Sequence, residues 1–208
     1  PALEDIKTAY PNRLEIVQGD ALQISPDSLT AEPYRIISNL PYNIATPLFT
    51  GWLENSWQGG EWEPRFLSMT CMFQKEVAQR IAAAPGTNSY GRLSVLAGWL
   101  TQARILFDVD RQVFVPPPNV TSSIVHVEPR ASPLAPADPR MLSQVTAAAF
   151  GQRRKMLRAS LKKICPSPSD ILAAADIAET KRAEQLEIEE FCKLARLIDD
   201  QNRQKPAH

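Results

Sequence analysis

The first 128 residues alternate between short apolar runs and helical patterns, as in an α/β protein. The runs Arg13–Gly19, Tyr34–Ser38 and Arg65–Phe73 are typical of buried strands. Two later runs, Gln102–Asp108 and Ser122–Val127, predict strands that close the sheet. Because helical patterns separate most of these runs, the alternation predicts a parallel sheet flanked by helices.

Helix boundaries are marked by proline and by capping residues. Thr46 followed by Pro47 predicts a helix start, with threonine as the N-cap and proline in the first helical position. The segment Gln74–Ala84 reads as a helix that Pro85 and Gly86 end, and Leu93–Leu100 continues as a further helix.

The segment Pro129–Pro139 carries four prolines in eleven residues and is predicted to be a linker. We expect an incomplete α/β domain over 1–128, the linker over 129–139 and a helical domain over 140–208. The helices expected in that last domain are Arg140–Phe150, Gln152–Ile164, Ser169–Ala175 and Thr180–Asp199.

The charge balance changes when the chain is divided at residue 129. The whole chain has 23 basic and 23 acidic residues, which alone argues against an electrostatic binder of nucleic acid. Residues 1–128 carry a net charge of −4 and residues 129–208 one of +4. Between Pro139 and Ser169 there are seven basic residues and no acid, so a cationic segment is concentrated in the predicted helical domain.

No stretch approaches the run of about 20 apolar residues that a membrane helix needs, and no secretory leader is recognisable, so we expect a cytoplasmic protein. Cys71, Cys165 and Cys192 are widely spaced and lack the close pairing of a zinc site. They are interpreted as buried thiols, and no metal is expected.

The tetrapeptide Asn39-Leu40-Pro41-Tyr42 directly follows a predicted strand, where open α/β sheets bind ligands. The amide oxygen of Asn39 and a carbonyl of the rigid Leu40-Pro41 unit could accept both hydrogens of an adenine amino group, while Tyr42 stacks on the base. Two such bonds would favour a tetrahedral nitrogen whose lone pair can attack a methyl group. The alternative interpretation is a simple turn.

Three segments of the chain, the first of which contains this tetrapeptide, resemble one known family of enzymes. The strings SNLPYNIATPLF, VFVPPPNVTSSIVHVEP (Val113–Pro129) and FGQRRKMLRASLK (Phe150–Lys162) are similar, in this order, to the ribosomal RNA adenine dimethyltransferases, most closely to the bacterial KsgA-type enzymes. The resemblance covers the chain from about Arg13 onward. It implies a Rossmann-like class I methyltransferase domain, here lacking its N-terminal part, followed by a small helical domain.

The resemblance also implies roles for individual residues. Asp20 and Ala21, in Gly19-Asp20-Ala21, would bind S-adenosylmethionine together with Asn39, and Asp20 would hold the adenine amino group of that cofactor. Tyr42 and Phe114 would sandwich the extruded target base, with Pro116-Pro117-Pro118 as a rigid wall. Without the resemblance, Asp20 reads as a turn residue and Phe114 as a core aromatic.

The family places a glycine-rich cofactor loop and a ribose-binding acid upstream of the residue at which this chain starts. None of the eight glycines forms a Gly-any-Gly pattern, and the first residue is Pro1. The first two strands of the family fold are therefore expected to be missing. We expect residues 1–208 to bind S-adenosylmethionine weakly or not at all.

The cationic segment is predicted to form a basic helix with Arg154, Arg158 and Lys162 on one face. Like charges at this spacing disfavour a helix, and a phosphate backbone would relieve their repulsion. The family's helical domain helps to dock the enzyme on the small ribosomal subunit. A solvated charged face is the alternative. The predicted RNA-binding residues are Arg153, Arg154, Lys155, Arg158 and Lys162.

The expected function is dimethylation of two adjacent adenines of 16S ribosomal RNA, on their N6 amino groups, by a monomer bound to the small subunit. Two alternatives stay open. One is the related methylase of large-subunit RNA that confers macrolide resistance. The other is a non-catalytic RNA-binding or ribosome-assembly factor that keeps the scaffold without the chemistry.

Overall fold

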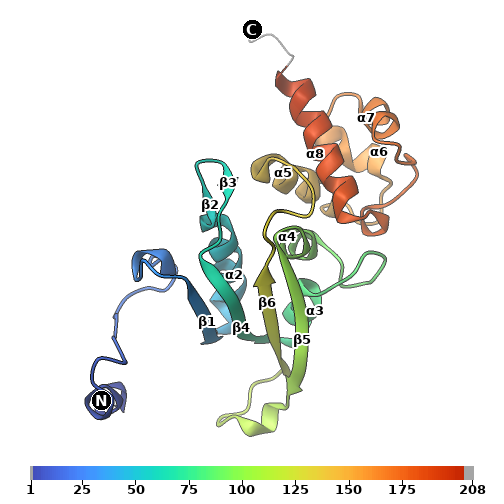
Figure 1. The fold of residues 1–208 in the computed structure, drawn as a ribbon. Coiled ribbons are helices and arrows are strands. Elements are labelled where there is room, and N and C mark those ends of the chain that lie inside the picture. Colours follow the sequence, from blue (N-terminus) through green and yellow to red (C-terminus); the bar gives the residue numbers. More distant parts are fainter. Residues whose placement is uncertain (1, 204–208) are drawn as a thin grey trace.

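A computed structural model describes residues 2–203, so the last five residues of the predicted helical domain and Pro1 lie outside the described part. Figure 1 shows a twisted sheet with helices against it, and a group of helices beyond one end of the sheet. We call residues 34–129 the sheet part and residues 139–203 the helical part.

The central sheet has four strands in the order β1-β4-β6-β5. Strands β1 and β4 are parallel, whereas the pairs β4/β6 and β6/β5 are antiparallel. The prediction of a parallel sheet is therefore wrong for two of the three pairs, because β5 returns into β6 through a loop, which needs no crossover helix. The strands are β1 Tyr34–Asn39, β4 Phe66–Gln74, β5 Thr101–Val109 and β6 Ser122–Pro129, and a hairpin is formed by β2 Trp57–Gln58 and β3 Glu61–Trp62.

Three helices, α2 Tyr42–Asn55, α3 Lys75–Ile81 and α4 Arg92–Leu100, pack against this sheet. The predicted helix start at Thr46-Pro47 is wrong, since α2 begins four residues earlier and contains Pro47. Proline inside a helix removes one backbone hydrogen bond. Burial of the apolar face of α2 offsets this cost, through Ala45, Leu48, Phe49 and Leu53.

The core of the sheet part is aromatic. Phe49 of α2 and Phe73 of β4 meet edge to face with ring centroids 5.9 Å apart, and both are fully buried. Trp99 of α4 is also fully buried and stacks on Trp57 at 5.4 Å. Such pairs stabilise a core by about 0.5–1.5 kcal/mol beyond their area burial, so α2 and α4 are fixed firmly on the sheet.

The predicted strand Arg13–Gly19 is wrong. Its residues form a turn and a segment without regular structure. That segment pairs with no strand of the described chain, so it lacks the neighbour that a strand needs for its backbone hydrogen bonds. Helix α1, Ala2–Ala9, buries no residue. Strand β1 is accordingly an edge strand, and on it Ile37 is 83% exposed.

The predicted linker contains no regular element but is tied to α4. The amide of Leu134 donates to the Trp99 carbonyl at 2.8 Å, and Trp99 Nε1 donates to the carbonyl of Ala135 at 2.7 Å. The amide of Arg130 donates to the Leu100 carbonyl at 2.9 Å. These bonds hold the segment against the end of the sheet part.

The helical part starts with α5, where Asp138 caps the helix by accepting a bond from the Met141 amide at 2.8 Å. The predicted helix Gln152–Ile164 is wrong in its first part, where residues 151–154 form turns, whereas the short helix α6 and the 3-10 turn η3 Leu161–Lys163 cover its second part. One reason is that the amide of Leu157 donates to the Lys181 carbonyl at 2.8 Å instead of to a helical partner. The helices are α5 Pro139–Phe150, α6 Leu157–Ser160, α7 Pro168–Ala174 and α8 Ile188–Arg203. Thus the helix expected from Thr180 begins only at Ile188.

The three cysteines are free and buried, as expected. Burial raises the pKa of Cys71 and of Cys192 to about 12. Within residues 2–203, no helix has both the length and the apolar character to cross a membrane, and no cluster of metal-binding side chains occurs.

Candidate active site

The strand directions bring three loops to one edge of the sheet. Strands β1 and β4 end there, β6 begins there, and β5 ends there, since Ser122 pairs with both Gln74 and Val109. We call this the catalytic edge. It holds residues 39–42, the start of α3 and the loop 110–121, which extends beyond the sheet in Figure 1.

The predicted loop Asn39-Leu40-Pro41-Tyr42 runs from the last residue of β1 to the first residue of α2, with Leu40 and Pro41 between the two elements. Leu40 is 5% exposed and anchors the loop in the core, while Asn39 is exposed. Pro41 (φ −58°, ψ 130°) precedes the first turn of α2, and its carbonyl accepts the amide of Ile44 at 3.1 Å. The Asn39 side chain and the Leu40 carbonyl have no hydrogen-bond partner among residues 2–203. Neither acceptor is therefore occupied by a donor from the described chain.

A hydrogen bond across the edge holds Tyr42. Its Oη lies 2.7 Å from Oγ of Ser122, the first residue of β6. Ser122 is fully buried, whereas Tyr42 is half-buried and keeps part of its ring accessible. The loop after β1 and the loop before β6 are thus joined by a side-chain contact between residues 80 positions apart.

Phe114 lies in the loop between β5 and β6, directly after a 3-10 turn, η2 Arg111–Val113. Asp110 caps this turn by accepting the Gln112 amide at 2.8 Å. The side chain of Phe114 is half-buried, and its neighbour Val115 is 98% exposed. The structure brings Phe114 to the same edge as Tyr42, but in the described chain the two rings do not form an aromatic pair.

An ion pair braces the other side of the edge. Lys75 Nζ lies 2.6 Å from Oδ2 of Asp108, and Ser123 Oγ donates to Oδ1 of the same carboxylate at 2.7 Å. These two bonds, the one from Lys75 being the stronger, hold the pKa of Asp108 below its usual value. The amide of Lys75 also donates to the Thr121 carbonyl at 2.9 Å. The charges of Lys75 and Asp108 are thereby paired with each other, and residues 39–42 contain no Asp, Glu, Lys or Arg.

Sequence reasoning missed Ser122, Lys75 and Asp108 as parts of this edge. Ser122 was recognised only as the start of a predicted strand, Lys75 only as part of a predicted helix and Asp108 only as the end of another predicted strand. Their roles depend on which strands pair and in which direction, and no local pattern carries that information.

Asp20 and Ala21 lie in an exposed turn. Oδ1 of Asp20 accepts the Leu22 amide at 3.0 Å, and its carbonyl accepts the amides of Gln23 and Ile24. All hydrogen bonds of Asp20 within the described chain are therefore local, and none joins it to Asn39. The structure does not bring these two predicted cofactor residues together with the catalytic edge.

The five predicted RNA-binding residues fall into two groups. Arg153 donates to the carbonyls of Thr87 and Asn88, and Arg158 pairs with Glu179 at 3.4 Å. The other three are exposed and form no ion pair or side-chain hydrogen bond with residues 2–203: Arg154, Lys155 and Lys162. Because Arg154 lies in a turn before α6, while Arg158 lies in α6 and Lys162 in the 3-10 turn after it, the three do not share one face of a continuous helix.

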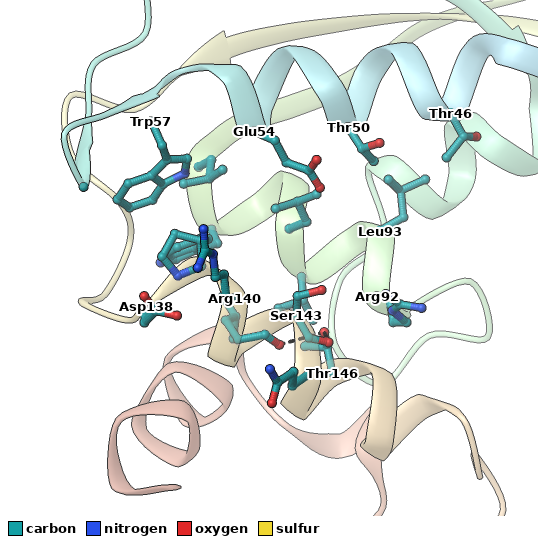
Figure 2. Close-up of a pocket in the computed structure, with 18 residues that line it drawn as sticks. Thr46, Thr50, Glu54, Trp57, Arg92, Leu93, Asp138, Arg140, Ser143 and Thr146 are labelled. Atoms are coloured by element: carbon teal, nitrogen blue, oxygen red, sulfur yellow. Dashed lines mark hydrogen bonds between the residues drawn. The ribbon is translucent and has the colours of Figure 1, made fainter. Parts of the chain in front are cut away.

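A hollow of about 1080 Å³ lies away from this edge. Figure 2 shows it between α2, α4 and the start of α5, with Thr46, Thr50 and Glu54 along one helix and Arg140 opposite Trp57. None of the predicted site residues lines it. A smaller hollow of about 360 Å³ does lie at the catalytic edge, between the start of α3 and the residues Val120 and Thr121.

Two solved structures define the class of the fold. A dimethyladenosine transferase from Plasmodium falciparum superposes with a TM-score of 0.78 at 24% identity, covering 96% of this chain and 78% of that one. The 23S rRNA methyltransferase ErmE gives a TM-score of 0.65 at 23% identity, covering 95% and 77%. The fold is that of the α/β methyltransferases, which confirms the predicted fold class.

Relatives in sequence narrow the class to a family. The chain is 51% identical over 199 residues to the ribosomal RNA small subunit methyltransferase A of Ruegeria sp. (strain TM1040), covering 96% of this chain and 70% of the relative. It is 52% identical over 196 residues to the protein of that name in Paracoccus denitrificans (strain Pd 1222), covering 94% and 68%. The family model of ribosomal RNA adenine dimethylase matches residues 3–200. The chain belongs to the ribosomal RNA adenine dimethylase family, which confirms the predicted family and enzyme class.

Proposed function

We propose that this chain provides the catalytic loop and the RNA-docking part of an enzyme that dimethylates two adjacent adenines in 16S ribosomal RNA. The observation that carries the proposal is the pair of free acceptors on Asn39 and Leu40, at the carboxyl end of β1 and next to the ring of Tyr42. Of the two carbonyls in the Leu40-Pro41 unit, only that of Leu40 is free for a substrate, because Ile44 occupies the other.

In this proposal the two acceptors hold the exocyclic amine of the target adenine. Each hydrogen of the amino group donates to one acceptor, which favours a tetrahedral nitrogen and releases its lone pair. In each of two rounds the nitrogen would bond to a methyl carbon as the donor's carbon–sulfur bond breaks and leaves a thioether, and the proton that the nitrogen loses would pass to water. After the first round one acceptor bond remains to hold the nitrogen. No ionised side chain of the loop takes part, in keeping with the neutral composition of residues 39–42.

Tyr42 and Phe114 are proposed to stack on the two faces of the extruded base. Stacking of a base on an aromatic side chain contributes about 1–3 kcal/mol, which offsets much of the cost of a few kcal/mol for extrusion. The bond between Tyr42 and Ser122 fixes the orientation of one ring. Phe114 belongs to a loop with an exposed apolar neighbour, Val115, so its ring can adjust when the base enters.

S-adenosylmethionine is the proposed methyl donor, and when bound it supplies an electrophilic methyl group on a sulfonium. The free amide of Asn39 fits a role beside this group. Asp20 has a second carboxylate oxygen without a hydrogen bond among the described residues and could accept from an adenine amino group, with Ala21 beside it. Asp20 and Ala21 can contribute only if their turn lies next to the catalytic edge when the cofactor is bound. None of the hydrogen bonds of Asp20 within the described chain reaches that edge.

The helical part is proposed to dock on RNA of the small subunit through Arg154, Lys155 and Lys162, the exposed cations without partners within residues 2–203. Arg158 can contribute only if it leaves Glu179. Phosphate contacts of this kind position a protein without reading sequence. With this role we retain the proposed division into a methyltransferase domain (1–128), a linker (129–139) and a docking domain (140–208). We further propose a cytoplasmic monomer that needs no metal.

Transfer of labelled methyl groups to small subunits that lack the modification tests the function. The chain should be assayed as printed and with an upstream glycine-rich cofactor segment of the family joined to its N-terminus. The extended chain is expected to transfer up to four methyl groups per subunit, two to each adenine, and Asn39→Ala in the same background to transfer none. Binding to subunits without any transfer by the extended chain would favour the non-catalytic assembly factor, and transfer to large subunits would favour the other methylase.

Cofactor binding by the chain itself is tested by calorimetry. Purified residues 1–208 are expected to bind S-adenosylmethionine weakly or not at all, because the contacts of Asp20 are confined to its own turn. Micromolar affinity would contradict this expectation, and Asn39→Ala measured in parallel would then report whether the site involves the catalytic edge.

A further inference from the structure

The structure points to Arg153 as a positioning residue rather than an RNA contact. We propose that Arg153 clamps residues 152–155, the basic turn, onto residues 82–91, the α3–α4 loop, and so sets the place of the docking cations relative to the catalytic edge. The part of this proposal that concerns RNA rests on the proposed function, whereas the clamp itself does not.

The side chain of Arg153 is already engaged within the protein. Its Nη2 lies 2.8 Å from the carbonyl oxygen of Asn88 and 3.3 Å from that of Thr87. The next two cations, Arg154 and Lys155, are likewise exposed but form no such bond with any residue from 2 to 203. Three adjacent exposed cations therefore differ in their contacts, and of the three only Arg153 bonds to the protein backbone.

The helical part holds the same loop at two further points. The amide of Gly86 donates to the carbonyl of Glu184 at 2.7 Å. Tyr90 is fully buried, and its ring meets that of Phe150 edge to face at 5.8 Å, while Phe150 in turn lies 5.5 Å from Phe191. Phe150 ends α5, and a single residue separates it from the basic turn. The aromatic contact of Phe150 and the hydrogen bonds of Arg153 therefore hold the α3–α4 loop from neighbouring positions in the chain. In Figure 1 the α3–α4 loop extends beneath the helical part.

Helix α3 connects this loop to the catalytic edge. At one end, Lys75 bonds to Thr121 and Asp108, as described above. At the other end, Ser94 closes the loop, because its Oγ donates to the Arg80 carbonyl at 2.6 Å and accepts the Gly91 amide at 3.0 Å. A helix of seven residues spans about 10 Å. The clamp thus links the basic turn to the catalytic edge through one short, braced element.

The chemistry of the contact separates positioning from phosphate binding. Both carbonyls accept from one terminal nitrogen, Nη2, and an arginine carries this nitrogen one bond farther from the backbone than a lysine carries its Nζ. Arg153→Lys keeps the charge that a phosphate would recognise and loses the reach that brings a donor to Thr87 and Asn88. If Arg153 positions the turn, Lys cannot replace it.

Amide hydrogen exchange tests the clamp on the chain as it stands. In Arg153→Lys and in Arg153→Ala, the amides of Tyr90 and Lys155, bonded to Thr87 and Gln152, are expected to exchange about tenfold faster. The matched control Arg154→Ala should leave both rates unchanged. Unchanged rates in both Arg153 variants would overturn the clamp.

Affinity for small ribosomal subunits, measured between low and high salt, tests the consequence for docking. Both Arg153 variants are expected to bind about tenfold more weakly with the wild-type salt slope, and Arg154→Ala to flatten the slope by about 0.7–0.9. A flattened slope in Arg153→Ala together with wild-type affinity in Arg153→Lys would identify Arg153 as a phosphate contact and refute the positioning role. If the unmodified chain does not bind subunits, the proposed docking fails, and hydrogen exchange still decides on the clamp.

Discussion

The hydrogen bond between Tyr42 and Ser122 joins the catalytic loop to β6, and its two ends differ in burial. Ser122 is fully buried and has this single side-chain bond among the described residues, whereas Tyr42 is half-buried and reaches solvent. Removing one partner or the other therefore leaves different groups unsatisfied. In a double-mutant cycle, the two single variants are therefore expected to lose different amounts of stability.

Tyr42→Phe leaves the buried hydroxyl of Ser122 without a partner. A buried polar group left unpaired costs about 1–3 kcal/mol, and we expect a loss of this size in the free energy of unfolding. Ser122→Ala leaves the Tyr42 hydroxyl able to bond water, so the expected loss is about 0.5–1.5 kcal/mol. The double variant removes both polar groups and is expected to be no less stable than Tyr42→Phe alone, which corresponds to a coupling energy of roughly 1 kcal/mol.

Urea unfolding of the four proteins measures these differences, provided that the slope with urea concentration is the same in all of them. Tyr42→Phe retains the ring, so its effect on methyl transfer should be much smaller than that of Tyr42→Ala, which also removes about 1–3 kcal/mol of stacking. Losses that add within about 0.5 kcal/mol would show that the two hydroxyls do not interact and would refute this reasoning.

Three further outcomes follow from the core and the titrating groups. Phe49→Ala should lower the free energy of unfolding by about 3–5 kcal/mol in urea titrations, since Phe49 is fully buried; a loss below 1 kcal/mol would contradict this packing. The lowered pKa of Asp108 means that its bond to Lys75 stabilises the fold at neutral pH and is lost as the pH falls below about 3.8; Asp108→Asn should therefore lose less stability on acidification. Burial raises the pKa of Cys71 and Cys192 to about 12, so neither should react with a thiol reagent at pH 8 until urea unfolds the chain.

The local sequence was sufficient to predict those elements that depend on an apolar run or on a contact between near neighbours in the chain. The apolar run at 34–38 and the longer one at 65–73 became β1 and β4 with shifts of one residue at their ends. Asp138 before Pro139 marks the start of α5 because capping is a contact between near neighbours. The position of Asn39 at the carboxyl end of a strand was equally predictable, although the strand includes Asn39 and does not end before it.

The sequence was misleading where tertiary contacts oppose a local signal. Thr46-Pro47 has the composition of a helix start, yet α2 extends through it because its apolar face is buried against β4. The run Gln152–Ile164 has a helical pattern, yet Arg153 and Leu157 bond to the α3–α4 loop and to Lys181. In both segments tertiary contacts contribute more free energy than local propensity, which differs by less than about 1 kcal/mol per ordinary residue.

The sequence by itself determined that this chain folds as an α/β protein, where the loop at residues 39–42 lies and where the cations gather. Only the tertiary structure decided which groups act together. The antiparallel return of β6 places Ser122 beside Tyr42, and the packing of α5 places Arg153 on a backbone loop 65 residues away. Such pairings depend on strand direction and on the burial of distant surfaces, and neither leaves a periodic signal in the chain.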